Sequence, residues 1–299
     1  MENQSNVLNL LKDLYTKIQH NNYTTPPKYS EVSFTLYNNI SQKNKDLLRS
    51  LSKLTKFSLI SPLEILYKQQ YEKHNSISNQ PDKCSICLCE FYDDIIDYNN
   101  NQLILKDFNS YIIHEIDTIK LFKCHDHFFH IECLLNYIKN QPGFKCANCQ
   151  NIYGIIIGNM PPGKMWVEVK DKLHCAGYPY DGTIIIHYEF KNGHGYSGTR
   201  RTNFLPNTER GREILGMLKI AFDRKLTFTV GTSVTTGKTN TVVWNGIHHK
   251  SSIDGGPTRY GYPDEGYFDR VEGELAEKGV VKTEGLEEIA LGLMYGGGY

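Results

Sequence analysis

Six cysteines and two histidines in the first half of the chain have types and spacing that suit a metal. Two residues separate the members of each pair, an interval that lets one short turn present two ligands to one ion. The eight residues are Cys84, Cys87, Cys124, His127, His130, Cys133, Cys146 and Cys149. Thiolates and imidazoles in fours are the donors of tetrahedral Zn²⁺, so we predict two structural zinc ions. His125 is the alternative to His127, because it also follows Cys124.

The second half carries its polar candidates beside glycine-containing turns. Trp244-Asn-Gly-Ile-His-His-Lys250 holds two adjacent histidines, which point to opposite sides of a strand or lie ~100° apart on a helix, so that one can face a pocket. Serine, threonine and glycine at positions 231–237 suit polar contacts to ribose or phosphate. The residues alone leave a second interpretation open, in which the histidines belong to the core or the surface and the turns are ordinary.

Regular elements must position these residues. In the second half, β-rich runs lie at 183–190, 226–230 and 240–244. Apolar residues at helical spacing predict a helix over 208–224, capped by Asn207 or Thr208, and a further helix is predicted from Glu265 or Tyr267 to Lys278. This is an α+β pattern.

The N-terminal region is predicted to be helical. Apolar residues at helical spacing indicate a helix over 2–20, and a second helical stretch over 43–71 that breaks near Pro62. The tract 97–102 is rich in asparagine and is predicted to be a solvated loop. We interpret this region as a scaffold or an adaptor surface of unknown role.

Glycine divides the chain near residue 150. Of the 25 glycines, only Gly143 lies in the first 150 residues. We predict a helical region over 1–80, a zinc finger over 81–152, an α+β domain over 153–281 and a C-terminal tail over 282–299.

Charge and hydropathy narrow the classes of protein. The 33 basic residues equal the 33 acidic ones, so nucleic-acid binding is not indicated by charge. No apolar run approaches the ~20 residues that cross a bilayer, so we expect no membrane partner. The start lacks the features of a secretory signal, which favours reduced thiols and a cytoplasmic or nuclear location. Cys89 and Cys175 are left over, and we expect both to be unreactive.

The ligand order Cys-Cys-Cys-His-His-Cys-Cys-Cys resembles a RING finger of the H2 type, and fits a PHD finger less well. The resemblance implies a cross-brace. One zinc would be held by Cys84, Cys87, His130 and Cys133, and the other by Cys124, His127, Cys146 and Cys149. It also implies docking of a ubiquitin-charged conjugating enzyme (E2), with Ile86 as the contact. Gln150 stands where many RING fingers place a basic residue that grips ubiquitin. A scaffolding zinc module is the alternative.

Several motifs of the second half occur in the order found in the Deltex C-terminal domain, and the RING-like segment lies directly upstream, as in Deltex proteins. They are Gly158–Met165, Phe204–Asn207, Leu226–Gly231, Trp244–Lys250 and Gly261–Asp264. The resemblance covers about residues 84–280. It implies a pocket for NAD or ADP-ribose, lined by Ser233, His248, Arg201 and Trp244, with Arg200 as the alternative to Arg201.

The same resemblance implies the catalytic residues Glu274, His248 and Tyr260. Glu274 would act as a general base on a ribose hydroxyl that attacks the ubiquitin thioester, although an exposed helix charge is the other interpretation of this residue. Tyr260 replaces the histidine of several family members. The resemblance therefore implies an E3 ubiquitin ligase directing ubiquitin to ADP-ribose or ADP-ribosylated protein targets. The alternatives are a non-catalytic ADP-ribose reader and scaffold, and an NAD-consuming enzyme that ADP-ribosylates ubiquitin.

Overall fold

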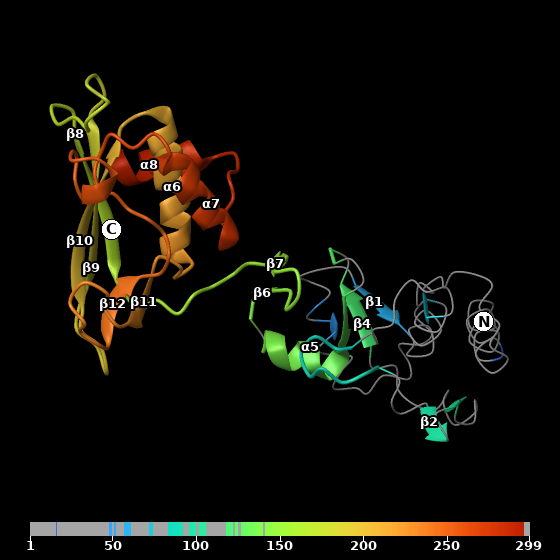
Figure 1. Ribbon diagram of the computed structural model, residues 1–299. Helices are drawn as coiled ribbons and strands as arrows, with labels where there is room; N and C mark the ends of the chain where they lie inside the picture. Colours follow the sequence, from blue (N-terminus) through green and yellow to red (C-terminus); the bar gives the residue numbers. More distant parts are fainter. Residues whose placement is uncertain are drawn as a thin grey trace. The chain divides into compact units, whose positions relative to one another are not determined.

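The computed structural model describes residues 16, 48–49, 51, 57–60, 72–73, 83–91, 96–99, 102–105, 118–121, 123–124, 127–139 and 141–295 (Figure 1). The chain divides into two compact units, Met1–Ile155 and Ile156–Tyr299. Helices and strands occur in both, so the chain has mixed α and β structure. Among the described residues, no helix has the length and apolar character needed to cross a bilayer.

The first unit contains a three-stranded antiparallel sheet of order β1-β4-β5. β1 (Phe57–Ile60) pairs with β4 (Thr118–Leu121), and β4 pairs with β5 (Phe128–His130). Helix α5 (Ile131–Ile138) follows β5 directly and buries its residues 131, 134, 135 and 138. That spacing gives the helix one apolar face, which packs into the core of the unit.

Two hairpins also lie in the described part of the first unit. β2 (Ile96–Asn99) pairs with β3 (Gln102–Leu105), and β6 (Gly143–Lys145) pairs with β7 (Ile152–Gly154). A Cβ on Gly143 would collide with the backbone of Ile155, so this position of the second hairpin requires glycine.

Two predictions for the first unit are wrong in part. The stretch over 43–71 is helical at residues 48, 49 and 51, as predicted, but it contains the strand β1, and the loop over 97–102 contains residues of the hairpin β2–β3. In both places pairing with another strand decides the structure, which helical spacing and low complexity do not report. The helix predicted over 2–20 lies outside the described residues except for position 16, which is helical.

The second unit is built on a three-stranded antiparallel sheet of order β10-β9-β8. Its strands are β8 (Lys164–Lys170), β9 (Thr183–Phe190) and β10 (Thr199–Pro206). A hairpin of β11 (Phe228–Gly231) and β12 (Thr241–Trp244) adjoins it through a bridge between Ser197 and Thr241. The predicted β-rich runs are confirmed as strands.

Three helices lie on one side of this sheet (Figure 1). They are α6 (Glu209–Asp223), α7 (Tyr267–Glu277) and α8 (Leu286–Tyr295), and a 3₁₀ turn, η3, spans Pro257–Arg259. The predicted cap of α6 is confirmed, because the Thr208 hydroxyl accepts a hydrogen bond from the Gly211 amide at 3.0 Å. The predicted end of α7 is also confirmed, since Gly279 has a φ of 77°.

Helix α8 corrects the predicted C-terminal tail over 282–299. Residues 286–295 form a helix that packs on α6 and buries Leu286 and Ala290. A Cβ on Gly216 of α6 would collide with the backbone of Leu286, so the missing side chain permits this close approach. The contact joins residues about 70 positions apart, and local sequence patterns do not report it.

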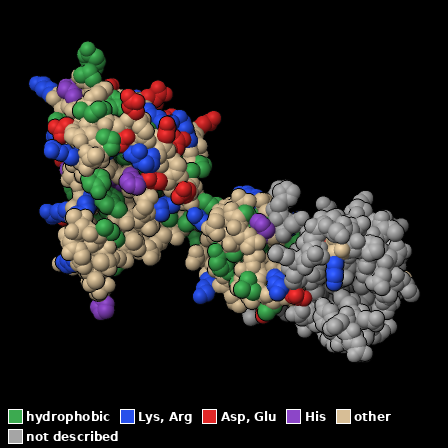
Figure 2. All heavy atoms as spheres, viewed as in Figure 1, with side chains coloured by type: hydrophobic (Ala, Val, Ile, Leu, Met, Phe, Trp, Pro, Cys, Tyr) green, Lys and Arg blue, Asp and Glu red, His purple; other side chains and the backbone are tan. Residues whose placement is uncertain are grey.

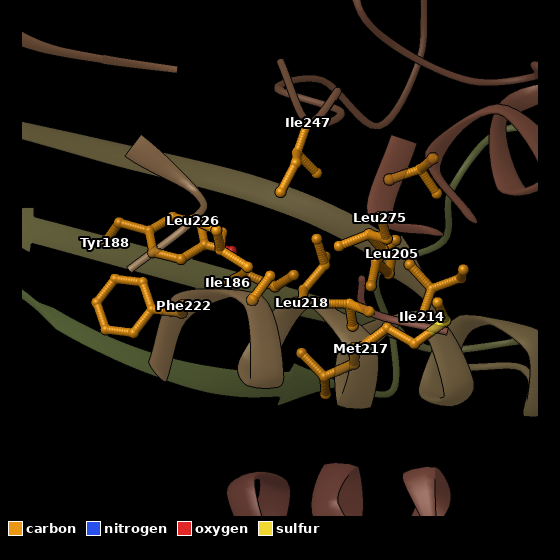
Figure 3. Close-up of a cluster of buried hydrophobic side chains, with 14 of the residues drawn as sticks. Ile186, Tyr188, Leu205, Ile214, Met217, Leu218, Phe222, Leu226, Ile247 and Leu275 are labelled. Atoms are coloured by element: carbon orange, nitrogen blue, oxygen red, sulfur yellow. The ribbon is translucent and has the colours of Figure 1, made fainter. Parts of the chain in front are cut away.

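The core of the second unit lies between the sheet and the helices. Figure 3 shows Ile186 and Tyr188 of β9 in one cluster with Leu218 and Phe222 of α6. Leu275 of α7 joins the same cluster. The core therefore fixes α7 against the sheet, and α7 carries Glu274.

On the surface of the second unit, charged side chains of both signs are intermixed (Figure 2).

Candidate functional site

The first Cys/His cluster joins a short turn to the start of α5. Cys84 and Cys87 lie on the turn, which is closed by hydrogen bonds from the Leu88 amide to the Cys84 carbonyl at 2.7 Å and from the Cys84 amide to the Cys89 carbonyl at 2.9 Å. His130 ends β5, and Cys133 lies in the first turn of α5. The ligand atoms of Cys84, Cys87, His130 and Cys133 all lie within 4.8 Å of one another.

The second cluster joins the end of β4 to the hairpin β6–β7. Cys146 and Cys149 lie on the hairpin turn, where the Gln150 amide donates to the Cys146 carbonyl at 3.1 Å. Cys124 follows β4 and is buried, and its Sγ lies 3.6 Å from that of Cys149. The ligand atoms of Cys124, His127, Cys146 and Cys149 again lie within 4.8 Å of one another. His127 is thus the histidine that the structure places in this cluster, and His125 lies outside the described residues.

The donor types and distances of both clusters suit zinc. Metal–ligand bonds of about 2.0–2.3 Å in a tetrahedron place neighbouring ligand atoms roughly 3.3–3.8 Å apart. The distances from the Nδ1 atom of His130 to the Sγ atoms of Cys87 and Cys133 are 3.3 and 3.9 Å. The cysteine and histidine pairs alternate between the clusters along the chain, as in a cross-brace, so each cluster could hold one zinc ion.

The second unit brings His248 and Glu274 together. The Glu274 carboxylate accepts a hydrogen bond from the His248 amide at 2.7 Å and contacts the imidazole Nδ1 with its other oxygen. The carboxylate side chain is 17% exposed, whereas the His248 side chain is 59% exposed. Glu274 therefore holds the imidazole in a fixed orientation at the surface, and within residues 156–295 the Nε2 atom of His248 makes no hydrogen bond.

The neighbouring His249 points the opposite way, into the core. Its Nδ1 lies 2.9 Å from the Ile247 carbonyl, so this nitrogen carries the hydrogen, and Nε2 accepts from the Tyr188 hydroxyl at 2.9 Å. Burial lowers the pKa of His249 to about 4, so the ring is neutral. The Trp244 indole stacks on this ring, with centroids 4.2 Å apart, and on Phe228, with centroids 4.3 Å apart. Trp244 thus packs nearly parallel to two neighbouring rings, which hold the indole in one orientation.

A buried ion pair adjoins the His248–Glu274 pair. The Lys250 ammonium lies 2.5 Å from Oδ2 of Asp264, which also accepts from Arg270 at 2.7 Å. Burial raises the pKa of Asp264, but the hydrogen bonds and charges of Lys250 and Arg270 outweigh it and hold the pKa below its usual value. The Tyr267 hydroxyl donates to the His248 carbonyl at 3.2 Å. These contacts tie the start of α7 to the segment that carries His248.

The other predicted pocket residues are not bonded to His248 or Glu274. Within residues 156–295, Ser233, Arg201 and Tyr260 make no hydrogen bond or ion pair with His248 or Glu274. Ser233 shapes the loop between β11 and β12, where its carbonyl accepts from the Gly237 amide at 2.8 Å. Arg201 is exposed on β10, and Tyr260 is exposed after η3 in the left-handed conformation. Their approach to a ligand stays a prediction.

The predicted E2 contact lies on the first turn. Ile86 is half-buried between Cys84 and Cys87. Gln150 has a φ of 60°, and its side-chain nitrogen Nε2 also donates to the Cys146 carbonyl, at 3.1 Å. The Gln150 side chain therefore folds back on the turn that carries Cys146 and Cys149.

Comparison with known proteins decides the family. Residues 157–280 match the family described as the Deltex C-terminal domain. This segment of the chain is a Deltex C-terminal domain.

Named relatives of the chain include three proteins from human and mouse. The Homo sapiens protein named "Probable E3 ubiquitin-protein ligase DTX3" is 42% identical over 146 residues, which cover 45% of this chain and 42% of the relative. The Mus musculus "E3 ubiquitin-protein ligase DTX4" is 39% identical over 176 residues, covering 54% of this chain and 28% of the relative. The Mus musculus "E3 ubiquitin-protein ligase DTX1" is 34% identical over 220 residues, covering 68% of this chain and 34% of the relative. The chain thus spans less than half the length of these relatives.

Sequence reasoning missed the buried residues beneath the Deltex site. Lys250 and Asp264 stand at the ends of two motifs, Trp244–Lys250 and Gly261–Asp264, and the opposite charges of the two residues were the available signal. His249 was recognised only as one of two adjacent histidines. Only the tertiary structure shows that Lys250 meets Asp264 and that His249 meets Tyr188.

Proposed function

We propose that this protein is a RING-type E3 ubiquitin ligase with two zinc ions in its first unit. The names of its Deltex relatives support the activity, and the two interleaved Cys/His clusters support the zinc ions. In this proposal the first unit docks an E2 that carries ubiquitin as a thioester, with Ile86 on the docking surface. We also propose a cytoplasmic or nuclear location, where thiols stay reduced.

The Deltex C-terminal domain would bind NAD or ADP-ribose and supply the acceptor for ubiquitin. The observation that carries this proposal is the contact of the Glu274 carboxylate with both the amide and the imidazole of His248. A carboxylate keeps further lone pairs when it accepts two hydrogen bonds, so Glu274 can still accept a proton from a ribose hydroxyl. Ser233, Arg201, Trp244 and Tyr260 complete the proposed pocket, and ADP-ribosylated proteins are the proposed targets.

The reaction would gain most from proximity. A hydroxyl held beside the thioester attacks its carbonyl carbon and forms an ester, the C–S bond breaks so that the E2 cysteine leaves as a thiolate, and the hydroxyl proton passes to Glu274, either directly or through the exposed imidazole of His248. Orientation of two reactants can contribute up to about 7–11 kcal/mol to the barrier. The zinc ions would be structural, because all their coordination positions are filled by protein ligands. They would stabilise the surface of the first unit that docks the E2.

The test mixes the full chain with an activating enzyme, an E2, ubiquitin and ADP-ribose or NAD. We expect a ubiquitin adduct of ADP-ribose, seen by mass spectrometry, that Glu274→Gln and Ile86→Ala each reduce by about 100-fold or more. Glu277→Gln is the matched control, because Glu277 is an exposed glutamate on the same helix, and it should retain the wild-type rate.

The outcomes separate the proposal from its alternatives. ADP-ribose binding without any adduct would favour a reader and scaffold. Transfer of the ADP-ribose label from NAD to ubiquitin with release of nicotinamide would favour the NAD-consuming enzyme. Equal yields in Glu274→Gln and wild type would contradict the general-base role.

A further inference from the structure

We propose that Lys250 and Asp264 form a positioning pair, which sets the distance between His248 and Glu274 by fixing the start of α7 against the 248–250 segment. This inference rests on the proposed function of the His248–Glu274 pair, and it assigns a role to two residues that do not contact that pair directly. It concerns the orientation of the site and leaves the identity of the base unchanged.

The surroundings of the ion pair favour orientation over stability as its role. The side chains of Lys250 and Asp264 are only 4% and 8% exposed. Removing two charges from water costs free energy that their mutual attraction often fails to recover, so a buried ion pair is weak evidence for stability. A buried charge is stable only where its partner lies at hydrogen-bonding distance, whereas an apolar side chain can pack in several positions. A buried ion pair therefore specifies one arrangement of the segments that carry it.

Further contacts leave the Lys250 ammonium little freedom. It lies 5.6 Å from the ring centroid of Tyr262 and 5.1 Å from that of Tyr267, within the range of cation–π attraction. Arg270, one turn into α7, donates to the same Asp264 oxygen. The ammonium is thus enclosed by residues that precede and begin α7, and a displacement of that helix start would break several contacts at once.

The positions of these residues along the chain connect the ion pair to the site. Lys250 lies two residues after His248, and Asp264 lies three residues before the first residue of α7. Glu274 follows seven residues into the helix, about 10 Å along its axis at 1.5 Å per residue. Tyr267 at the helix start donates to the His248 carbonyl, and Glu274 accepts from the His248 amide. Two points on one rigid helix therefore contact one residue, and the ion pair sets how the helix approaches it.

The core contact of His249 does not replace this pair. His249 bonds to Tyr188 and to its own neighbour Ile247, and so it fixes the segment against the sheet. It makes no hydrogen bond to α7 within residues 156–295. Lys250 is thus the residue of the segment whose side chain reaches the start of α7.

The test compares three variants of the full chain. Lys250→Met keeps the length of the stem and removes the charge, while Asp264 keeps Arg270 as a partner. Lys250→Arg restores a cation. Arg210→Met is the matched control, because Arg210 of α6 pairs with Asp269 and Glu272 of α7 on the exposed side and does not contact His248.

Two measurements report the orientation and activity of the His248–Glu274 pair independently of the stability of the fold. The first is the ¹⁵N signal of the His248 ring nitrogens in histidine-labelled protein, identified with His248→Gln. In the wild type, Lys250→Arg and Arg210→Met, we expect a single tautomer whose Nδ1 carries the hydrogen and donates it to Glu274. In Lys250→Met we expect a mixture of the two tautomers. The second is the rate of ADP-ribose modification, where Lys250→Met should lower kcat by about 10- to 100-fold with KM changed less than about twofold.

Each outcome decides the proposal. An unchanged His248 signal in Lys250→Met would overturn it, as would an equal effect in Arg210→Met. If Lys250→Met does not fold, the double variant Lys250→Met/Asp264→Asn removes both charges, and its His248 signal decides in the same way. If the wild type modifies no ADP-ribose, the proposed function fails, while the His248 signal still tests the positioning pair.

Discussion

The two units hold their functional residues by different means. In the first unit, eight side chains converge from turns and element ends, and the donor types themselves specify the arrangement. In the Deltex C-terminal domain, His248 and Glu274 are 26 residues apart, and a packed core, a buried histidine and a buried ion pair hold them together. With zinc bound as proposed, the first arrangement would depend on an ion, whereas the second depends on packing, so the two units should respond to different perturbations.

Removal of zinc should have the largest effect and should be confined to the first unit. Structural zinc binding contributes roughly 10–16 kcal/mol in small zinc domains, so a strong chelator or Cys84→Ser should unfold this unit. The Deltex domain should keep its own thermal transition. Mass spectrometry of the native protein should find two zinc ions in the wild type and fewer in the variant.

Conversely, a native protein with fewer than two zinc ions and a folded first unit would contradict the cross-brace. Cys175→Ser is the matched control, because Cys175 is buried in the Deltex domain and should leave the zinc content unchanged.

Acid should weaken the Deltex domain through His249. The pKa of this buried ring is about 4, below the 6.5 of an exposed histidine, so the unfolded state takes up the proton first as pH falls. Stability is therefore complete above pH 6.5 and declines between pH 6.5 and 4, by on the order of 3 kcal/mol. Denaturant unfolding of the second transition measures this decline. His249→Phe should flatten it, and an equal decline in that variant would assign it to other groups.

A side chain at Gly216 should affect only the Deltex domain. Gly216→Ala places a Cβ against the Leu286 backbone, and overpacking of this kind costs about 1–3 kcal/mol. Gly273→Ala is the matched control, because a Cβ there meets nothing within 4 Å and helix propensity favours alanine. Denaturant midpoints of the second transition should fall for the first variant and hold or rise for the second, while zinc content stays constant in both. A midpoint that does not fall in Gly216→Ala would contradict the close approach of α8.

The smallest effect should come from Gln150, which follows the last ligand. Gln150→Arg provides a cation where the RING resemblance places a ubiquitin contact, and one charge-assisted hydrogen bond of about 1 kcal/mol corresponds to a roughly fivefold faster discharge of the E2 thioester. Gln150→Ala should discharge at the wild-type rate, since among the described residues the Gln150 side chain donates to the carbonyls of Cys146 and Ala147 in its own turn. Equal rates in all three proteins would show that this position does not grip ubiquitin.

Local patterns were sufficient for part of the fold. The helix over 209–223 and its Thr208 cap follow from apolar spacing and from a hydroxyl at the right position, both of which act within one or two turns. The strand over 183–190 follows from its β-branched and aromatic residues. The strand over 57–60 could not be found in this way, because its partner lies some 60 residues away. The three predicted boundaries between the four segments stay predictions, although the last segment contains the helix α8.

The sequence by itself determined the residue types and intervals of the eight candidate metal ligands, and through its motifs the similarity to the Deltex C-terminal domain. Only the tertiary structure decided that His248 faces Glu274 while His249 faces the core, and that Lys250 meets Asp264. The physical reason is the range of the interactions. A two-residue interval constrains its own turn wherever it occurs, whereas the direction of an adjacent side chain depends on which distant segments pack against it.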